Sequence, residues 1–393
     1  NYPKPVSSFI YRNDSKDGVP KFTDVSSTIA KDLSNIGLVC DAVFTDFDND
    51  GWSDLIVAGE WMPLTFFKNN NGVFRNITQQ TGTGSETGFW NSIAPGDFDN
   101  DGDIDYIVGN MGQNTFYRAS KQYPVKIYAK DFDNNGNYDA LPSLYLFDDD
   151  GRKHEYPAHT RDDLIKQMIG MRSKFQNYKL HANATMDQLF TPDDLKNALV
   201  LEANNFKSCY FQNMGNSKFE ITALPALAQL STINGMAIDD FNDDGNLDIV
   251  INSNDYGTET TVGRYDALNG LYMQGDGKGN FSARSIAESG IYIPGNGKAI
   301  VRIKSATGKC LVVASQNRGP LKVFKSKSNS QPISVLPWEV SAVITYKDGR
   351  SRKQELYYGA SFLSQSGRFI SVGSLVKSIE LTDSKGNKRK ITL

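Results

Sequence analysis

The 393-residue chain is poor in the side chains on which most covalent and metal-dependent catalysis depends. It has three histidines, and His154-Glu155 and His159 stand one residue too far apart for a zinc-binding HExxH helix, which Pro157 would also break. It lacks a GxSxG elbow, a P-loop and a GxGxxG turn after a strand. Its odd number of cysteines excludes a fully paired disulfide framework, so we expect free thiols at Cys40, Cys209 and Cys310.

Two further features are missing from the sequence. No run of 18 apolar residues occurs, so we expect no membrane span. No basic cluster with interleaved aromatics occurs, and the formal charge is −3, so nucleic acid is not an expected partner. The chain begins Asn1-Tyr2-Pro3, without a methionine or a signal peptide, and we expect a mature product or a part of a longer protein.

A ten-residue acidic motif is present four times, beginning at Asp46, Asp97, Asp131 and Asp240. Oxygen-bearing side chains occupy positions 1, 3, 5 and 9, and glycine always occupies position 6. Calcium accepts six to eight oxygen ligands in flexible geometry, and glycine permits the sharp turn around the ion. The spacing therefore predicts up to four calcium sites. The predicted ligands are Asp46, Asp48, Asp50, Trp52 and Asp54; Asp97, Asp99, Asp101, Asp103 and Asp105; Asp131, Asp133, Asn135, Asn137 and Asp139; and Asp240, Asn242, Asp244, Asn246 and Asp248.

These loops differ from EF-hands, which need a glutamate at position 12 and flanking helices. Position 12 is Val57, Val108, Pro142 or Ile251, and the flanking runs are β-branched and aromatic, as in strands. Each loop is thus expected to be a hairpin turn. The alternative is an Asx-rich turn without metal, because aspartate, asparagine and glycine favour turns in any case.

The hairpins recur in a unit of four antiparallel strands, with the acidic loop between the first two and an Asn/Gly turn between the last two. Such units predict an all-β fold, a β-propeller of six or seven blades. We expect units near Cys40, Ser92, Val125, Ala237 and Lys298, with a half-unit at the N-terminus. The second unit shows no clear fourth strand. In the third, a helical insertion at about 150–205 is expected to precede a third strand near 208–212.

The units resemble FG-GAP or VCBS repeats, the integrin-α-like calcium-binding propeller. The C-terminal part, with Asp348-Gly349-Arg350 and Leu363-Ser364-Gln365-Ser366, resembles an ASPIC/UnbV domain. The resemblance implies two domains, 1–330 and 331–393, in a secreted or surface protein of the Bacteroidetes type. It also implies extracellular binding or adhesion with calcium as a structural ion. Cytosolic calcium is too low to fill weak sites, which favours an extracytoplasmic location as well.

In a propeller blade the acidic loops lie on one face, and the connections between second and third strands lie on the other. The connections between successive units share that other face. We expect polar and aromatic residues of both sets of connections to form a ligand face for a glycan or a protein. In the alternative, the tryptophans cap the core and the insertion covers the channel. The residues predicted for this face are Glu60, Trp61, Trp90, Asn91, Asn110, Asn114, His159, Arg161, Arg264, Tyr265, Asp266 and Arg318.

The sequence therefore predicts a non-catalytic binding module with calcium as its cofactor and no assigned catalytic residue. A second hypothesis is a polysaccharide lyase acting on uronate-containing glycans, for which Lys130, His159 and Arg161 are the only candidate grouping. A third is a purely architectural domain of a longer surface protein.

Overall fold

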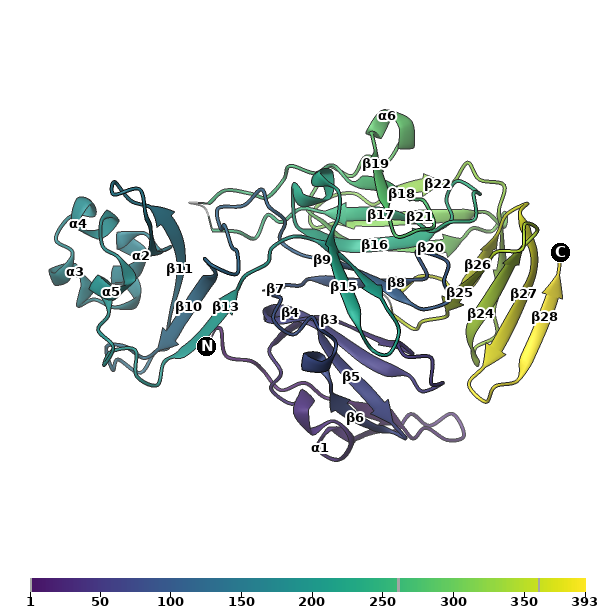
Figure 1. Cartoon of the computed structure of the whole chain (residues 1–393), viewed down its shortest axis with the longest axis horizontal. Coiled ribbons are helices and arrows are strands. Elements are labelled where there is room, and N and C mark those ends of the chain that lie inside the picture. Colours follow the sequence, from purple (N-terminus) through teal and green to yellow (C-terminus); the bar gives the residue numbers. More distant parts are fainter. Residues whose placement is uncertain (1, 260–261, 360) are drawn as a thin grey trace.

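The computed structural model describes residues 2–259, 262–359 and 361–393 and is predominantly β, with antiparallel pairing throughout (Figure 1). Four central sheets follow one another along the chain. The first holds β3 (Leu38–Thr45), β4 (Asp54–Pro63), β5 (Thr65–Asn70) and β6 (Val73–Asn76), with β7 (Thr87–Phe89) also on β4; the second holds β8 (Ser92–Gly96), β9 (Asp105–Gly109), β14 (Cys209–Asn213) and β15 (Phe219–Ala223). The third holds β16 (Ile233–Asp239), β17 (Asp248–Ser253), β18 (Leu271–Gly275) and β19 (Phe281–Arg284), and the fourth β20 (Gly297–Lys304), β21 (Cys310–Gln316) and β22 (Lys322–Lys325).

The first strands of these sheets, β3, β8, β16 and β20, lie next to one another in that order. Buried side chains fill the spaces between successive sheets, with Phe47, Phe66 and Trp90 between the first and second, and Phe98, Ile249 and Met273 between the second and third. Over the residues that the structure covers, the sheets form no closed barrel or ring. The all-β class is confirmed, whereas the number of blades is not fixed.

The second central sheet is interrupted by a long insertion between β9 and β14. The strand Cys209–Asn213 pairs with β9, with Cys209 opposite Val108 and Phe211 opposite Tyr106. Its assignment to the third unit was therefore wrong, and so was the expectation that the second unit has no clear fourth strand, since β15 supplies it. Assigning strands by their order along the chain fails here because the insertion separates two strands of one sheet.

The insertion is a small β-sheet covered by short helices. Its strands run in the order β12 (Lys153–Pro157), β11 (Asp139–Phe147), β10 (Val125–Lys130) and β13 (Leu199–Ala203), and the third acidic loop joins β10 to β11. The helices are α2 (Arg161–Gln167), α3 (Met171–Lys174), α4 (Tyr178–Ala182) and α5 (Met186–Leu189). Thr160 caps α2 by accepting a hydrogen bond from Asp163 N. Figure 1 places this unit at one end of the molecule and the C-terminal sheet at the other.

The remaining elements flank the central sheets. An N-terminal hairpin of β1 (Tyr11–Asn13) and β2 (Phe22–Asp24) is followed by α1 (Ser26–Ile29) and a 3-10 turn at Lys31–Leu33. Further short helices are the 3-10 turns Thr78–Gln80 and Ala226–Gln229, and α6 (Ile286–Ser289). The C-terminal sheet runs β25 (Ser351–Glu355), β24 (Glu339–Tyr346), β27 (Val376–Asp383) and β28 (Lys388–Thr392), beside a pair formed by β23 (Gln331–Ser334) and β26 (Phe369–Val372).

Candidate metal centres

Three of the four acidic loops bring carboxylates together tightly enough to hold one ion. Oxygens of Asp46, Asp48 and Asp50 lie within 4.8 Å of one another, and the same holds for Asp97, Asp99 and Asp101 and for Asp131, Asp133 and Asp139. The fourth loop has an asparagine, Asn242, at position 3. In this loop Asp240 accepts hydrogen bonds from Asp244 N at 3.1 Å and Gly245 N at 2.9 Å, as Asp46 does from Asp50 N and Gly51 N. The loop is thus wound in the same way.

The backbone of each loop depends on two residues with positive φ. Position 4, which is Asn49, Asn100, Asn134 or Asp243, has φ between 57° and 61°. The glycine at position 6 has φ between 85° and 94°. Asparagine and aspartate tolerate this left-handed region better than other residues with a side chain, and glycine enters it without steric cost. The loop sequence therefore dictates the tight turn that gathers the carboxylates.

Position 9 is a buried carboxylate that fastens the loop to its sheet. Asp54, Asp105 and Asp248 have no exposed surface, and Asp139 is 2% exposed. Each accepts a hydrogen bond from the backbone N–H of position 2. In the three central loops a second backbone N–H comes from the third strand of the sheet, as from Asn213 to Asp105 at 2.8 Å. Burial raises the pKa of Asp105 to about 8 and that of Asp54 to about 7.

The donor set fits a hard divalent cation. Several carboxylates crowd each loop, and Asp48 Oδ1 and Asp97 Oδ1 are buried without a hydrogen-bond partner among the described residues. A buried, unpaired carboxylate oxygen is costly unless a cation neutralises it. Calcium and magnesium both accept all-oxygen ligands, and such an ion, when bound, would neutralise the carboxylates and fix the loops.

The first loop differs from the others because a lysine lies beside its carboxylates. Lys68 Nζ contacts Asp48 and is 3.0 Å from Asp50 Oδ2. At the same strand position, the second and fourth loops have neutral amides: Gln212 donates to Asp99 at 2.8 Å and Gln274 to Asp244 at 3.2 Å. Lys68 therefore supplies an internal positive charge that would compete with a bound cation.

The three central loops are connected to one another through position 4. Asn49 Nδ2 donates to Asp103 Oδ1, at position 7 of the second loop, at 2.5 Å. Asn100 Nδ2 donates in the same way to Asn246 Oδ1 of the fourth loop at 3.2 Å. Sequence reasoning missed this role, although the recurrence of asparagine or aspartate at position 4 was visible in all four copies.

The C-terminal sheet sits directly on these three loops through β25 and the turn before it. Arg352, only 2% exposed, donates to Gly245 O at 3.2 Å, and Lys353 N donates to Asp97 Oδ2 at 2.8 Å. Glu355 accepts from Thr45 Oγ1 at 2.9 Å and from Asp46 N at 3.0 Å. One strand thus contacts the first, second and fourth loops at once.

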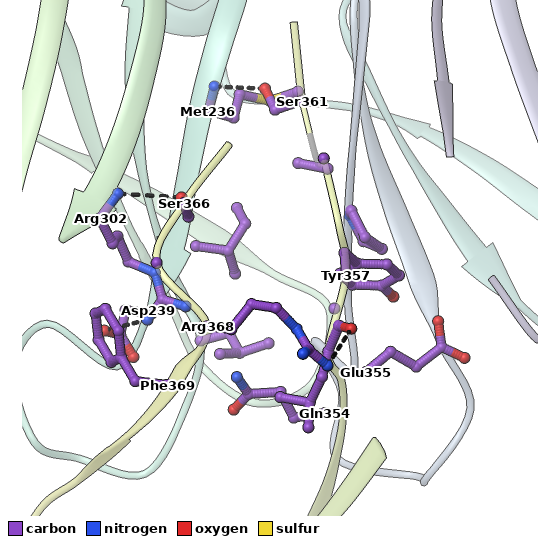
Figure 2. A pocket seen from close by; sticks show the side chains of 18 of the residues that line it. Met236, Asp239, Arg302, Gln354, Glu355, Tyr357, Ser361, Ser366, Arg368 and Phe369 are labelled. Atoms are coloured by element: carbon purple, nitrogen blue, oxygen red, sulfur yellow. Dashed lines mark hydrogen bonds and ion pairs between the residues drawn. The ribbon is translucent and has the colours of Figure 1, made fainter. Parts of the chain in front are cut away.

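Beyond β25, the chain runs along the first strands of the central sheets, where a row of serines accepts hydrogen bonds (Figure 2). Ser361 Oγ accepts from Met236 N at 2.8 Å, Ser364 Oγ from Ile300 N at 3.1 Å and Ser366 Oγ from Arg302 N at 3.1 Å. These N–H groups lie on the edges of β16 and β20 that face away from their neighbouring strands. Ser364 and Ser366, which belong to the stretch that resembles an ASPIC/UnbV domain, and Ser361 thus satisfy backbone N–H groups on those edges.

Several residues predicted for the ligand face are buried instead. Trp61 is 7% exposed and packs beside Phe89, with Phe206 and the inserted sheet around it, and its Nε1 donates to Tyr2 OH at 2.6 Å. Tyr2 OH in turn donates to Glu60 at 3.1 Å. Trp90 lies in the core between the first two sheets with no exposed surface. Their prediction as an aromatic platform is therefore wrong, because aromatic side chains at sheet junctions gain more from packing than from exposure.

Asn110 is also a structural residue. It is fully buried, and its amide donates to Asn205 O at 2.9 Å and Lys207 O at 3.3 Å, while its backbone N–H donates to Ser208 Oγ at 3.0 Å. These bonds join the two ends of the insertion. Its assignment to a ligand face is wrong, because its side-chain amide is hydrogen-bonded within the protein.

The other predicted face residues are spread over several connections. Arg264, Asp266, Asn114 and Arg318 are exposed, Tyr265 is buried and Asn91 is half-buried. The Arg264 guanidinium lies 4.7 Å from the centre of the Tyr256 ring. The structure does not gather these side chains into one described pocket.

The grouping considered for lyase chemistry does not converge. Lys130 Nζ donates to the carbonyl oxygens of Asp194 and Lys196, and Arg161 Nε donates to that of Phe175. His159 lies against Gln167 and 3.9 Å from Glu259, and burial lowers its pKa. The two cations are thus occupied with backbone carbonyls that stabilise the insertion.

Comparisons with known proteins give limited further information. The family model for an FG-GAP-like repeat matches residues 46–108, which include the first two acidic loops. No curated protein matches the chain. The crystal structure of the V. cholerae biofilm matrix protein Bap1 aligns with 91% of this chain and 59% of that chain, at 10% identity and a TM-score of 0.18, so the chain spans less than two thirds of that protein. No helix in the described part of the chain is long and apolar enough to cross a membrane.

Proposed function

We propose that the chain is a non-catalytic binding module of the extracytoplasmic space, stabilised by calcium. In this proposal the four central sheets are blades of a propeller-like array within residues 1–330, and residues 331–393 form an ASPIC/UnbV-like domain. The observation that carries the proposal is the set of three carboxylate triads, each with oxygens within 4.8 Å. The FG-GAP-like match over residues 46–108 supports the same reading of the first two loops.

Calcium has a structural part in this proposal. Bound at the predicted ligands of the first, second and fourth loops, it would fix the surface on which β25 lies. The contacts of Arg352, Lys353 and Glu355 depend on the backbone positions of those loops. The third loop lies within the insertion and would stiffen that unit separately.

A glycan or protein ligand would bind at the insertion end, away from the C-terminal sheet. A cleft of about 280 Å³ at the base of the insertion is lined by Glu86, Arg118, Lys121, Asn204 and Asn205, among others. Charged and amide side chains in a concave site suit the hydroxyl groups of a sugar or the backbone of a peptide. Asn114, Arg264, Asp266 and Arg318 are the exposed face residues that we retain as candidates for the surrounding surface.

The proposal is tested in two steps. Chelated protein is titrated with Ca²⁺ and, as a control, Mg²⁺, and its unfolding is followed thermally. At about 100 times its dissociation constant each independent site adds roughly 2.7 kcal/mol of stability, so a large calcium-specific rise in midpoint is expected. Equal effects of both ions, or none, would contradict calcium-specific sites.

A glycan and protein array is then probed in calcium. Binding without turnover, weakened by the paired substitution Arg118→Ala and Lys121→Ala, is the expected result. Release of an unsaturated product absorbing in the ultraviolet, from uronate-containing polysaccharides, would instead support the lyase hypothesis. A chain that binds nothing on the array but still responds to calcium would support the architectural one.

A further inference from the structure

The central sheets pack by a repeated aromatic arrangement that is incomplete at the last junction. In each of the first three sheets, position 2 of the acidic loop places a phenylalanine edge-to-face against an aromatic ring of the third strand. The ring centres are 5.7 Å apart for Phe47 and Phe66, 6.0 Å for Phe98 and Tyr210, and 6.4 Å for Phe241 and Tyr272.

At the first two junctions a third ring covers this pair. It comes from the fourth strand of the following sheet. Phe219 of β15 lies 4.6 Å from Phe66, and Phe281 of β19 lies 5.5 Å from both Phe98 and Tyr210. An aliphatic residue two positions later packs beside it, Ile221 or Ala283. The covered rings are 3% exposed or less.

At the junction of the third and fourth sheets no such ring is present among the described residues. The fourth sheet ends at β22, and nothing pairs with the outer edge of that strand in the described ranges. Phe241 and Tyr272 are only half-buried there. Beside them lies a groove of about 650 Å³ whose apolar walls are formed by Val250, Ile291, Val312 and Phe324.

Ile300 N and Arg302 N donate to serines and so face away from β21, which leaves Val301 as the residue whose backbone bonds Val313. The backbone groups of Val312 and Ala314 then face β22, where they pair with Phe324 and Lys322. The backbone of Phe66 faces the fourth strand, because Ile77 N donates to Phe66 O at 2.9 Å. In β22 the backbone groups of Val323, the residue between Lys322 and Phe324, likewise face the open edge. An unpaired edge beside an apolar groove is the arrangement that accepts an added strand.

We propose that this groove binds an extended peptide strand of a partner protein, which completes the fourth sheet. The strand would carry an aromatic residue and an aliphatic residue two positions later, as β15 does with Phe219 and Ile221. The aromatic ring fills the position over Phe241 and Tyr272, and the strand backbone pairs with β22. Lys322, Lys325 and Lys327 along this edge favour acidic residues in the remaining positions.

The probe is a fluorescein-labelled peptide with the sequence of residues 215–224, taken from the chain's own fourth strand. Its control carries Phe219→Ser. Fluorescence anisotropy with the full chain is expected to show saturable binding of the first peptide and at least about tenfold weaker binding of the second. Equal binding of both peptides, or no binding of either, would overturn the proposal.

Two protein variants on α6 locate the site. Ser289 lines the groove, so Ser289→Trp should abolish peptide binding by placing an indole in it. Ala287 is exposed on the same helix and does not line the groove, so Ala287→Trp should bind as the original chain does. Equal binding by the two variants would contradict this location, and their melting midpoints establish that both are folded.

A second copy of the chain is the competing occupant, because β2 carries an aromatic residue, Phe22, that is 62% exposed. Sedimentation distinguishes it. If the chain forms a dimer that Phe22→Ala converts to monomer, and if no peptide binds, the partner-strand proposal is wrong and the groove is a self-association site. These results are independent of the calcium titration, so the failure of either proposal is recognised separately.

Discussion

The serine row between the C-terminal segment and the central sheets makes a prediction about local stability. Ser364 accepts a hydrogen bond from the N–H of Ile300, a residue with no exposed surface, and donates to Phe362 O at 2.7 Å. Ser364→Ala removes the acceptor without adding volume. The Ile300 N–H is then left buried with no partner, since the hydroxyl is the group that reaches it.

The expected cost follows from that orphaned donor. A buried donor that loses its acceptor costs about 1–3 kcal/mol, which is more than the net value of an average hydrogen bond. We expect about 2 kcal/mol for Ser364→Ala, and the same for Ser361→Ala, whose partner Met236 N is equally buried. Ser366→Ala should cost about 1 kcal/mol, because its bond to Arg302 N is only partly buried.

Amide hydrogen exchange measures the effect where it occurs. A loss of about 2 kcal/mol in local opening free energy should speed exchange at Ile300 about thirtyfold. Ser384→Ala, at an exposed position in the turn between β27 and β28, is the matched control and should change nothing by more than about 0.5 kcal/mol. Unchanged exchange at Ile300 and Met236 in their variants would refute the role of the serines in holding this segment.

Three further predictions concern single side chains. Lys68→Gln, which copies Gln212 of the second loop, should raise the calcium affinity of the first loop about tenfold by removing a competing charge; calorimetric titration showing no gain would contradict this. Asp41→Asn should stabilise the chain by about 3 kcal/mol at pH 7 and not at all below pH 4. Burial raises the folded-state pKa of Asp41 to about 6, so the carboxylate loses stability as pH rises from about 4 to 6; equal urea midpoints of variant and original at pH 7 would exclude it. Asn110→Ala should cost about 3 kcal/mol in urea unfolding because the amide loses its bonds to the carbonyl oxygens of Asn205 and Lys207, and an unchanged urea midpoint would contradict this structural role.

The local structure of the acidic loops could be predicted from the sequence. The spacing of acidic residues and glycine predicted turns between strands, and the turns at 46–54, 97–105, 131–139 and 240–248 are all present between consecutive strands. This succeeded because the φ preferences of Asn and Gly act within the loop itself. The same strictly local information could have identified position 4, since Asn49 and Asn100 are both left-handed and both reach the next loop.

Non-local contacts could not be predicted in the same way. Nothing in Cys209–Asn213 distinguishes a partner for β9 from a partner for β11, because both offer similar apolar edges. Trp61 and Trp90 have the composition of a binding platform, yet burial decides their role and burial depends on sheets far away in sequence. The docking of β25 on three loops likewise depends on the assembled array.

The insertion within the second central sheet has a consequence for the order of events during synthesis. β9 ends at Gly109 and its partner β14 begins at Cys209, so the sheet cannot close until the intervening chain has been made. Closing a flexible loop of about 100 residues costs roughly 4 kcal/mol in chain entropy beyond the cost of a very short one. An inserted unit that folds first, with its ends joined at Asn110 and Ser208, removes most of that cost. We therefore expect the insertion to fold before the second central sheet, whose strands β9 and β14 pair afterwards.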